Sequence, residues 1–221
     1  PYGTRTLEEV AERSRLMAAW LEEAGCGVVT IACNTASAAS LHGLRRDRPH
    51  MTYVGMEPAV KPAAQVTDAG RVGVVATAAT FQGELFASVV SRFAAGIEVF
   101  TAACPRWVEL VEEGAVAGPE AEDEVRRCLQ PLMGEGIDVL VLACTHFPAL
   151  LEVIREVVDG SVVVVDPSPA VARQTARLAG DMGLQAGEGT TRLLSTARPE
   201  RLSATAVGLG LESAAALLPL G

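Results

Sequence analysis

Short apolar runs alternate along this chain with longer segments whose apolar residues recur at helical spacing. The helical pattern is clear over 6–23, where Thr6 begins a Thr-Leu-Glu-Glu capping signal and one face carries Val10, Leu16, Met17 and Leu21. Further helices are predicted over 58–67, 80–94, 106–113, 119–132, 148–158 and 168–182. The apolar runs predict strands at 28–31, 52–55, 71–76, 98–101, 139–142 and 162–165, and a Thr-Arg-Leu-Leu strand and an Ala/Leu-rich helix follow residue 190. Such alternation predicts an α/β fold with mostly parallel sheets.

Two of the predicted strands end in nearly the same residues. The run 28–31 leads into Ala32-Cys33-Asn34-Thr35, and the run 139–142 leads into Ala143-Cys144-Thr145-His146. Each cysteine therefore lies where a strand passes into a helix, which is where open α/β sheets bind ligands. The repetition of this element predicts an internal two-fold repeat with two α/β lobes. We assign residues 1–57 with 166–221 to the first lobe and residues 58–165 to the second.

Two thiols that face one cleft can move a proton from one face of a carbon to the other, one as base and one as acid. A helix N-terminus stabilises a thiolate, so a cysteine there can take either role. Asn34, Thr35 and Thr145 place short hydrogen-bonding side chains at the helix starts, where exposed N–H groups favour carboxylates. Either cysteine alone would more often be a small buried apolar residue. The matching of the two motifs favours a site for proton transfer on a small acid.

Other polar residues and cysteines near these motifs leave alternatives open. Cys26, Cys104 and Cys128 lack such a context and are assigned to packing. His146 is either a helix-cap residue or a catalytic helper, and Glu112 with Glu113 is more often a solvated helix end than an acid–base pair. Thr77 and Thr80 follow the strand at 71–76 and either cap the next helix or face the cleft, while Asp166-Pro167-Ser168 is typical of a plain N-cap.

Composition narrows the class of protein. The 221 residues are 49% hydrophobic and carry a net charge of −9, with Lys61 as the single lysine and no long block of either charge. This charge pattern lacks the basic cluster that binding to nucleic acid or anionic lipid requires. No apolar run approaches the roughly 20 residues of a membrane span. The five cysteines are an odd set without CxxC spacing, which predicts reduced intracellular thiols rather than a disulfide framework or a zinc site. With no lysine in either motif for a Schiff base, we expect no organic cofactor and no metal.

Four stretches together resemble the cofactor-independent glutamate racemases of bacterial cell-wall synthesis, within the aspartate/glutamate racemase superfamily. The matching stretches are Pro1-Tyr2-Gly3-Thr4-Arg5, Ile31-Ala32-Cys33-Asn34-Thr35-Ala36-Ser37-Ala38, Ala103-Cys104-Pro105 with Leu110-Val111-Glu112, and Leu142-Ala143-Cys144-Thr145-His146-Phe147-Pro148. The two cysteine motifs indicate the superfamily. The other two stretches point to the glutamate racemases in particular.

The resemblance implies two pseudo-symmetric three-layer α/β lobes that close over L- or D-glutamate without pyridoxal phosphate. It makes Cys33 and Cys144 the acid–base thiols, with Glu112 and His146 as their helpers. Its substrate contacts would be Pro1, Tyr2, Gly3, Asn34, Thr35 and Thr145, with Thr77 and Thr80 as further candidates. It also implies a cytoplasmic homodimer that supplies D-glutamate for peptidoglycan.

The sequence departs from this family at its start. The family opens with a strand that ends in Asp-Ser-Gly, upstream of the Pro-Tyr-Gly segment, whereas this sequence opens at Pro1. We therefore expect a fragment of a racemase, of uncertain activity on its own. The rival hypotheses are a superfamily relative acting on aspartate, a hydantoin or another small acid, and a non-catalytic protein that retains the cleft for binding.

Overall fold

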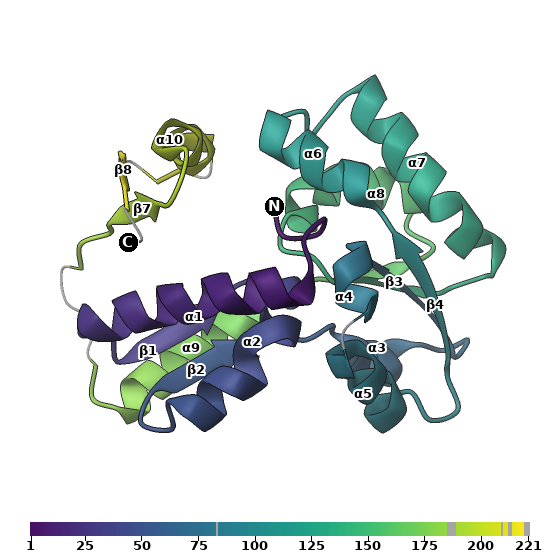
Figure 1. Ribbon diagram of the computed structural model, residues 1–221. Coiled ribbons are helices and arrows are strands. Elements are labelled where there is room, and N and C mark those ends of the chain that lie inside the picture. Colours follow the sequence, from purple (N-terminus) through teal and green to yellow (C-terminus); the bar gives the residue numbers. More distant parts are fainter. Residues whose placement is uncertain (83, 185–188, 209, 212–213, 219–221) are drawn as a thin grey trace. The chain divides into compact units, whose positions relative to one another are not determined.

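The computed structural model describes residues 1–82, 84–184, 189–208, 210–211 and 214–218 (Figure 1). The chain forms two compact units, Pro1–Ala179 and Gly180–Gly221. All the residues proposed for the site lie in the first unit. Across the described segments, no helix is both long enough and apolar enough to cross a membrane.

A small parallel sheet opens the first unit. It pairs β1 (Val28–Ile31) with β2 (Thr52–Gly55), and α2 (Asn34–Asp47) connects them. The preceding α1 (Leu7–Glu23) begins at the predicted capping box, in which Thr6 and Glu9 satisfy one another's backbone N–H groups. Both helices pack their apolar sides together with this sheet. The core that results holds Ala18, Val29, Leu41, Leu44 and Tyr53.

A second, four-stranded parallel sheet has the order β4-β3-β5-β6. Its strands are β3 (Arg71–Ala76), β4 (Glu98–Ala103), β5 (Val139–Leu142) and β6 (Val163–Val165). Because side chains alternate along a strand, β3 and β5 present apolar residues to both faces. One face packs on α3 (Val60–Val66) and α5 (Glu84–Phe93), and the other packs on α6 (Pro105–Glu113), α7 (Pro119–Gly134) and α8 (Leu151–Val158). Helices thus cover both faces of this sheet, as the α/β class requires (Figure 1).

The chain returns to the first sheet after β6. Helix α9 (Ser168–Asp181) lies beside β1, and the Thr175 and Thr30 hydroxyls are 2.8 Å apart. The predicted α/β class with parallel sheets is therefore confirmed. The predicted boundaries of the lobes stay a prediction.

Local differences from the predicted elements have simple causes. The helix predicted over 80–94 is divided into α4 (Ala78–Gln82) and α5, on either side of position 83, which lies outside the described residues. The helix predicted over 148–158 opens with a 3₁₀ turn, η1 (Phe147–Leu150), before α8. Pro148 stands in that first turn, where a missing N–H group costs least.

The described residues of the second unit form three short elements. The strand β7 (Leu193–Ser195) overlaps the predicted Thr-Arg-Leu-Leu segment at its two leucines, and α10 (Pro199–Gly208) follows it. A strand not foreseen from the sequence, β8 (Ala215–Leu217), pairs with β7 in parallel. Three-residue apolar segments carry no period long enough to tell strand from helix, which is why the sequence did not reveal it.

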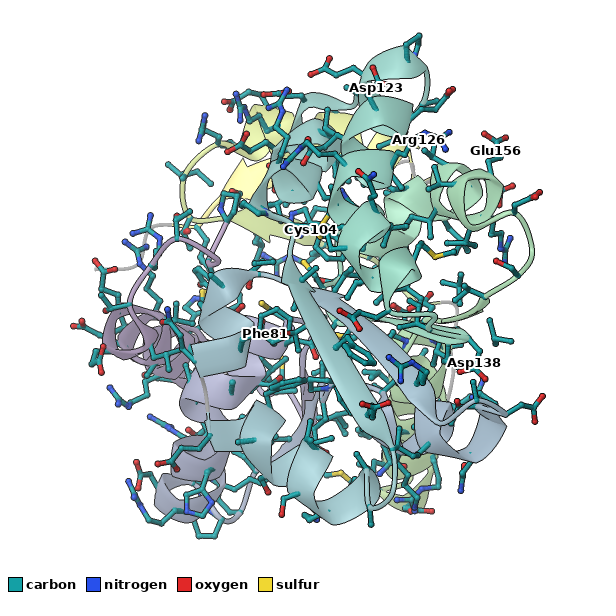
Figure 2. The ribbon with its side chains drawn as sticks, turned by 90° about the vertical axis from the view of Figure 1, so that its right-hand side faces the viewer. Phe81, Cys104, Asp123, Arg126, Asp138 and Glu156 are labelled. Atoms are coloured by element: carbon teal, nitrogen blue, oxygen red, sulfur yellow. A yellow bond between two sulfur atoms is a disulfide. The ribbon has the colours of Figure 1, made fainter. Side chains whose placement is uncertain are left out.

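The prediction that all five cysteines are reduced and that Cys104 and Cys128 serve only packing is wrong for this pair. They form a disulfide, with Cα atoms 6.1 Å apart. Cys104 lies just beyond the carboxyl end of β4, opposite the end at which Asp138 precedes β5 (Figure 2), and Cys128 lies in α7. Their separation of 24 residues follows no short motif, so only the packing of α7 on the sheet reveals the pair. Cys26, Cys33 and Cys144 are free.

Candidate active site

The two matched cysteines lie at the carboxyl ends of β1 and β5, as the sequence predicted. Cys33 is the N-cap of α2 in extended conformation, and its Sγ accepts from the Ala36 N–H at 3.5 Å. Cys144 follows β5 by two residues and leads into η1. A third strand end, that of β3, is followed by Thr77. The chain thus collects its candidate side chains where parallel α/β folds bind ligands.

The two thiols are close enough to interact electrostatically. Burial, with a smaller contribution from the charge of Cys33, raises the pKa of the Cys144 thiol to about 11, against the opposing effect of the His146 and Phe147 backbone N–H groups. Only 9% of Cys144 is exposed. At neutral pH Cys144 is therefore a protonated thiol, which suits an acid.

A hydrogen-bonded pair stands behind Cys144. The Nδ1 atom of His146 lies 3.8 Å from the Cys144 Sγ, and its Nε2 atom lies 2.9 Å from Oε1 of Glu112. If Nε2 carries the proton that is donated to Glu112, Nδ1 is left as an acceptor facing the thiol. In the structure, His146 contacts the Cys144 thiol and Glu112 contacts His146, so the two predicted helpers lie one behind the other at the same thiol.

Three threonine hydroxyls form a closed triangle beside Cys33. Thr35, Thr77 and Thr80 are buried, and each pair of their Oγ1 atoms is 3.1 Å apart. The triangle joins α2 to the segment that follows β3. Next to Thr35, Asn34 is 2% exposed, and neither of its amide atoms has a hydrogen-bond partner among the described residues. A buried amide without partners is costly unless a ligand satisfies it.

The N-terminal segment contributes close contacts to the same region. A Cβ at Gly3 would lie 2.8 Å from both Cβ and Cγ2 of Thr77, so only glycine allows this approach. Burial raises the pKa of the Tyr2 hydroxyl; the charge of Arg13 lowers it and that of Cys33 raises it, so Tyr2 lies near that thiol. Pro1 is exposed.

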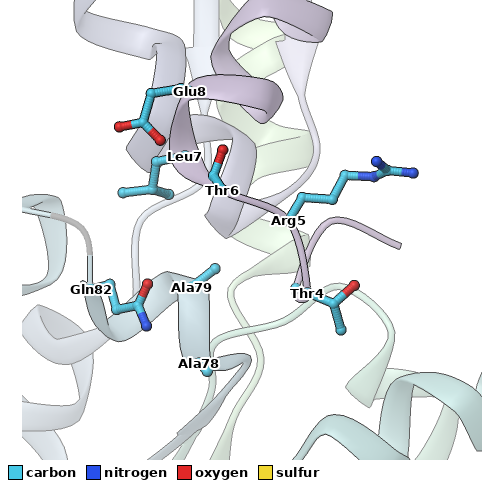
Figure 3. Close-up of a pocket in the computed structure, with 9 residues that line it drawn as sticks. Thr4, Arg5, Thr6, Leu7, Glu8, Ala78, Ala79 and Gln82 are labelled. Atoms are coloured by element: carbon cyan, nitrogen blue, oxygen red, sulfur yellow. The ribbon is translucent and has the colours of Figure 1, made fainter.

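Two cavities flank these residues. One, of about 480 Å³, has a mainly apolar lining and includes Ala32 and Thr145, the immediate neighbours of Cys33 and Cys144. The other, of about 450 Å³, lies between residues 3–8 and α4 (Figure 3). Its lining includes Gly3 and Ala79, so it adjoins the contact of Gly3 with Thr77. In the part of the chain that the structure describes, no three His, Cys, Asp or Glu side chains are grouped to hold a metal ion.

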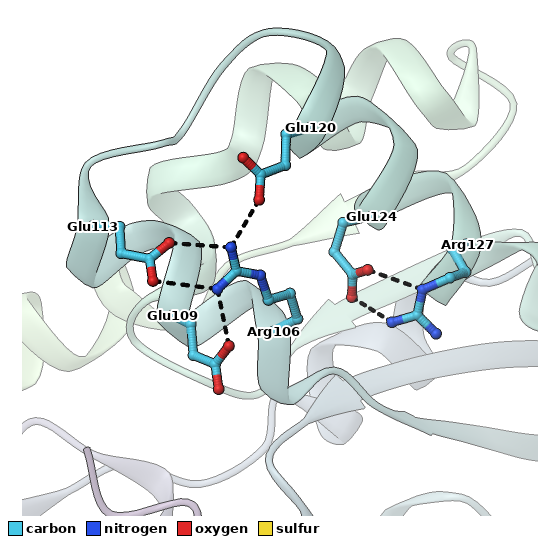
Figure 4. A network of polar contacts seen from close by, with 6 residues as sticks. All are labelled: Arg106, Glu109, Glu113, Glu120, Glu124 and Arg127. Carbon is cyan, nitrogen blue, oxygen red and sulfur yellow. Dashed lines mark hydrogen bonds and ion pairs between the residues drawn. The ribbon is translucent and has the colours of Figure 1, made fainter.

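Helix α6, which carries Glu112, is fixed to its surroundings at several points. The disulfide begins at its N-cap, Cys104. On its outer side, Arg106 forms ion pairs with Glu109 and Glu113 of α6 and with Glu120 of α7 (Figure 4). Glu113 therefore belongs to a surface network, whereas its neighbour Glu112 faces His146.

Comparison with known proteins decides the family. The Asp/Glu/Hydantoin racemase family model matches residues 1–175. The chain belongs to this racemase family. It is 42% identical over 207 residues to the glutamate racemase of Roseiflexus sp. (strain RS-1), covering 92% of this chain and 76% of the relative. It is 40% identical over 204 residues to that of Pseudomonas aeruginosa (strain UCBPP-PA14), covering 91% and 77%. The resemblance to glutamate racemases is thereby confirmed.

Solved structures of racemases agree with this assignment. The Bacillus anthracis glutamate racemase isoform RacE1 has a TM-score of 0.87 at 27% identity, with 100% of this chain and 84% of that chain covered. The Escherichia coli glutamate racemase, solved with L-glutamate and the activator UDP-MurNAc-ala, has a TM-score of 0.84 at 30% identity, with 99% and 84% covered. The two-lobed racemase fold therefore describes this chain as well.

Sequence reasoning missed two features of the racemase site. It did not foresee the disulfide at the start of α6. It also gave no role to Ser37, a buried serine four residues after Cys33 that lies within the matched stretch 31–38, because its hydrogen-bond partners are visible only in the folded structure.

Proposed function

We propose that this racemase interconverts L- and D-glutamate by moving the α-proton between Cys33 and Cys144. The observation that carries the proposal is the pair of matched thiols at the ends of β1 and β5, near enough for the charge of one to raise the pKa of the other. Support for glutamate as substrate comes from the relatives, which are named glutamate racemases at about 40% identity.

In the proposed reaction, the thiolate on one face of the substrate removes the α-proton and becomes a thiol. The electron pair left on the α-carbon is delocalised into the adjoining carboxylate, and the thiol on the opposite face then donates its own proton. The opposite enantiomer is processed with the two roles exchanged. Each turnover leaves the two thiols with reversed protonation, and exchange with solvent resets them. Only the two thiols are required, without metal or organic cofactor.

His146 and Glu112 would serve Cys144 when it has to act as base. The raised pKa of Cys144 favours its thiol form, so proton removal from its Sγ needs an acceptor. Nδ1 of His146 is the near acceptor, and Glu112 stabilises the imidazolium that results. Cys33 would rely on the Ala36 N–H instead.

The substrate would be held by groups that suit an amino acid with two carboxylates. The hydroxyls of Thr35, Thr77 and Thr80 can exchange their mutual hydrogen bonds for bonds to a carboxylate, and the Asn34 amide has no partner among the residues that the structure describes. Pro1, Tyr2, Gly3 and Thr145 complete the proposed contacts, as the family resemblance implies. A homodimer, a cytoplasmic location and a role in supplying D-glutamate for peptidoglycan are part of the same proposal and rest on that resemblance.

The proposal is tested with purified chain incubated separately with L- and D-glutamate in D₂O. Circular dichroism follows loss of optical activity, and proton NMR follows replacement of the α-proton. We expect both enantiomers to reach the same racemic end point, with solvent deuterium entering the product. L- and D-aspartate are the controls. Faster turnover of aspartate would assign the site to a different acid, and binding of glutamate without α-exchange would assign it to a binding protein.

A further inference from the structure

We propose that Ser37 is a positioning residue for Cys33, whose hydroxyl fixes the first turn of α2 against the ends of both strands of the small sheet. The activity measurements below rest on the proposed racemisation, whereas the thiol-reactivity measurement does not.

The Ser37 hydroxyl uses both its donor and its acceptor capacity. It donates to the carbonyl oxygen of Ile31 at 3.2 Å, at the end of β1, and accepts from the N–H of Met56 at 2.9 Å, just beyond β2. Its own backbone N–H donates to the Cys33 carbonyl at 2.9 Å. Ser37 is 2% exposed, so water does not compete for these bonds. One side chain thus links the two strand ends to the turn that carries Cys33.

Cys33 depends on that turn more than Cys144 depends on η1. Cys144 has the side chains of His146 and Glu112 behind it. The Cys33 thiol accepts a hydrogen bond from the Ala36 backbone N–H, at 3.5 Å, a contact that a small shift of the helix would break. The small sheet has only two strands, each of four residues, among the described segments. It therefore restrains the helix start weakly by itself.

Helix α2 also packs closely against the end of β2. A Cβ at Gly55 would lie 2.4 Å from Cδ2 of Leu41, so the helix approaches the end of β2 at a glycine. The Leu41 side chain thus packs directly against the end of the sheet. Apolar contact is non-directional, however, and the hydrogen bonds of Ser37 supply the orientation about the helix axis.

The same helix offers a matched control. Ser40 is also buried, at 4% exposure, but among the described residues its hydroxyl bonds to the Ala36 carbonyl alone, at 2.7 Å, within α2 itself. The Ser37→Ala and Ser40→Ala variants remove the same atom from the same helix. They differ in whether a connection to the strand ends is lost.

The first measurement is alkylation of each cysteine by iodoacetamide in the full chain, quantified by peptide mass mapping. In Ser37→Ala we expect the rate at Cys33 to fall about threefold or more, because the N–H support of its thiolate is disturbed. The rate at Cys144 in the same molecules should stay at the parent value. Ser40→Ala should change neither rate, and Ser37→Thr, which keeps the hydroxyl, should restore the rate at Cys33.

The second measurement is racemisation of glutamate. In Ser37→Ala we expect kcat to fall about 10- to 100-fold with KM little changed, as for a misplaced reacting group. Alkylation of Cys33 at the parent rate in Ser37→Ala, or equal changes at Cys33 and Cys144, would overturn the proposal. If Ser37→Ala does not fold, the test uses Ser37→Thr. A folded Ser37→Thr variant in which Cys33 is alkylated more slowly than in the parent would also overturn the proposal. If the parent chain does not racemise glutamate, the proposed function is wrong. The alkylation rates of Cys33 and Cys144 would still test the positioning role of Ser37.

Discussion

The Nδ1 atom of His146 lies 3.8 Å from the Sγ atom of Cys144. Glu112 holds the other nitrogen of the same ring, so one thiol of the pair has an ionisable relay behind it. Cys33 has the backbone N–H of Ala36 instead. Two cysteines in nearly identical sequence motifs are therefore supported by different chemical groups.

Replacing Glu112 with Gln should lower kcat about 10- to 100-fold, because the imidazolium of His146 loses its carboxylate partner. The two enantiomers have equal free energies in water, so kcat/KM must fall equally in both directions. Because Glu112 acts at only one of the two thiols, its loss can affect the two directions differently only through the separate kcat and KM values for L- and D-glutamate. Initial-rate kinetics with each enantiomer measures all four constants.

The matched control is Glu113→Gln on the same helix. Glu113 pairs with Arg106 on the outer side of α6 and should leave kcat unchanged. If Glu112→Gln and Glu113→Gln behave alike, Glu112 is not a positioning residue for the thiol.

Cys33→Ala and Cys144→Ala should each abolish racemisation, because a single thiol returns a proton only to the face from which it removed one and so cannot invert the α-carbon. Each variant keeps one thiol and can still exchange the α-proton of the enantiomer that faces it. We therefore expect the two variants to incorporate deuterium into opposite enantiomers of glutamate, as followed by NMR in D₂O. Cys26→Ala, at a free cysteine outside both motifs, is the control. Racemisation by both active-site variants at near-parent rates would rule out the two-thiol mechanism.

Stability should depend on pH through Cys144. Its folded-state pKa is raised from 9.0 to about 11, so above pH 9 the unfolded chain releases a proton that the folded chain retains. The contribution is fully present below pH 9 and is lost as the pH rises to about 11, amounting to roughly 2–3 kcal/mol. Urea unfolding of the parent and Cys144→Ala at several pH values isolates this effect. Parallel curves for the two proteins would show that the thiol is not buried in the folded state.

Reduction of the Cys104–Cys128 disulfide should destabilise the chain by about 3 kcal/mol, from the loss of a 24-residue cross-link. Thiol titration of the unfolded protein should find three free cysteines before dithiothreitol and five after it. Cys128→Ser should match the reduced parent and respond no further to reductant. In a reducing cytoplasm such a bond would be under constant attack. Five free thiols without any reductant would mean that the pair is only in contact.

Several of these features follow from sequence and others could not. The positions of Cys33 and Cys144 were predictable, because apolar runs mark strands and parallel strands collect ligands at their carboxyl ends. The serial arrangement of Glu112 and His146 was not, since it depends on how α6 lies over η1. The disulfide and the bridge made by Ser37 join segments distant along the chain, and neither leaves a local pattern. Sequence periodicity reports which face of an element is buried, and tertiary packing decides which side chains meet.

The contact of Gly3 with Thr77 gives the last prediction. A Cβ at Gly3 would lie 2.8 Å from the Thr77 Cβ, which is fixed to the backbone and cannot rotate away. Gly3→Ala must therefore displace the N-terminal segment or the Thr77 hydroxyl, which bonds to Thr35 and Thr80. Because Gly3 lies in a segment outside the helices and strands, we expect little change in the melting temperature but an increase in KM of about tenfold or more, the loss of roughly one good hydrogen bond to a charged group.

Gly43→Ala is the control for Gly3→Ala, since a Cβ at that position would meet nothing within 4 Å among the described residues beyond its own stretch of helix, and α2 continues through it. It should leave KM unchanged and raise the melting temperature slightly, because alanine favours a helix over glycine. Isothermal titration with D-glutamate separates weaker binding from slower chemistry. A Gly3→Ala variant that binds and racemises glutamate like the parent would remove the N-terminal segment from the substrate site and leave the threonine triangle to act alone.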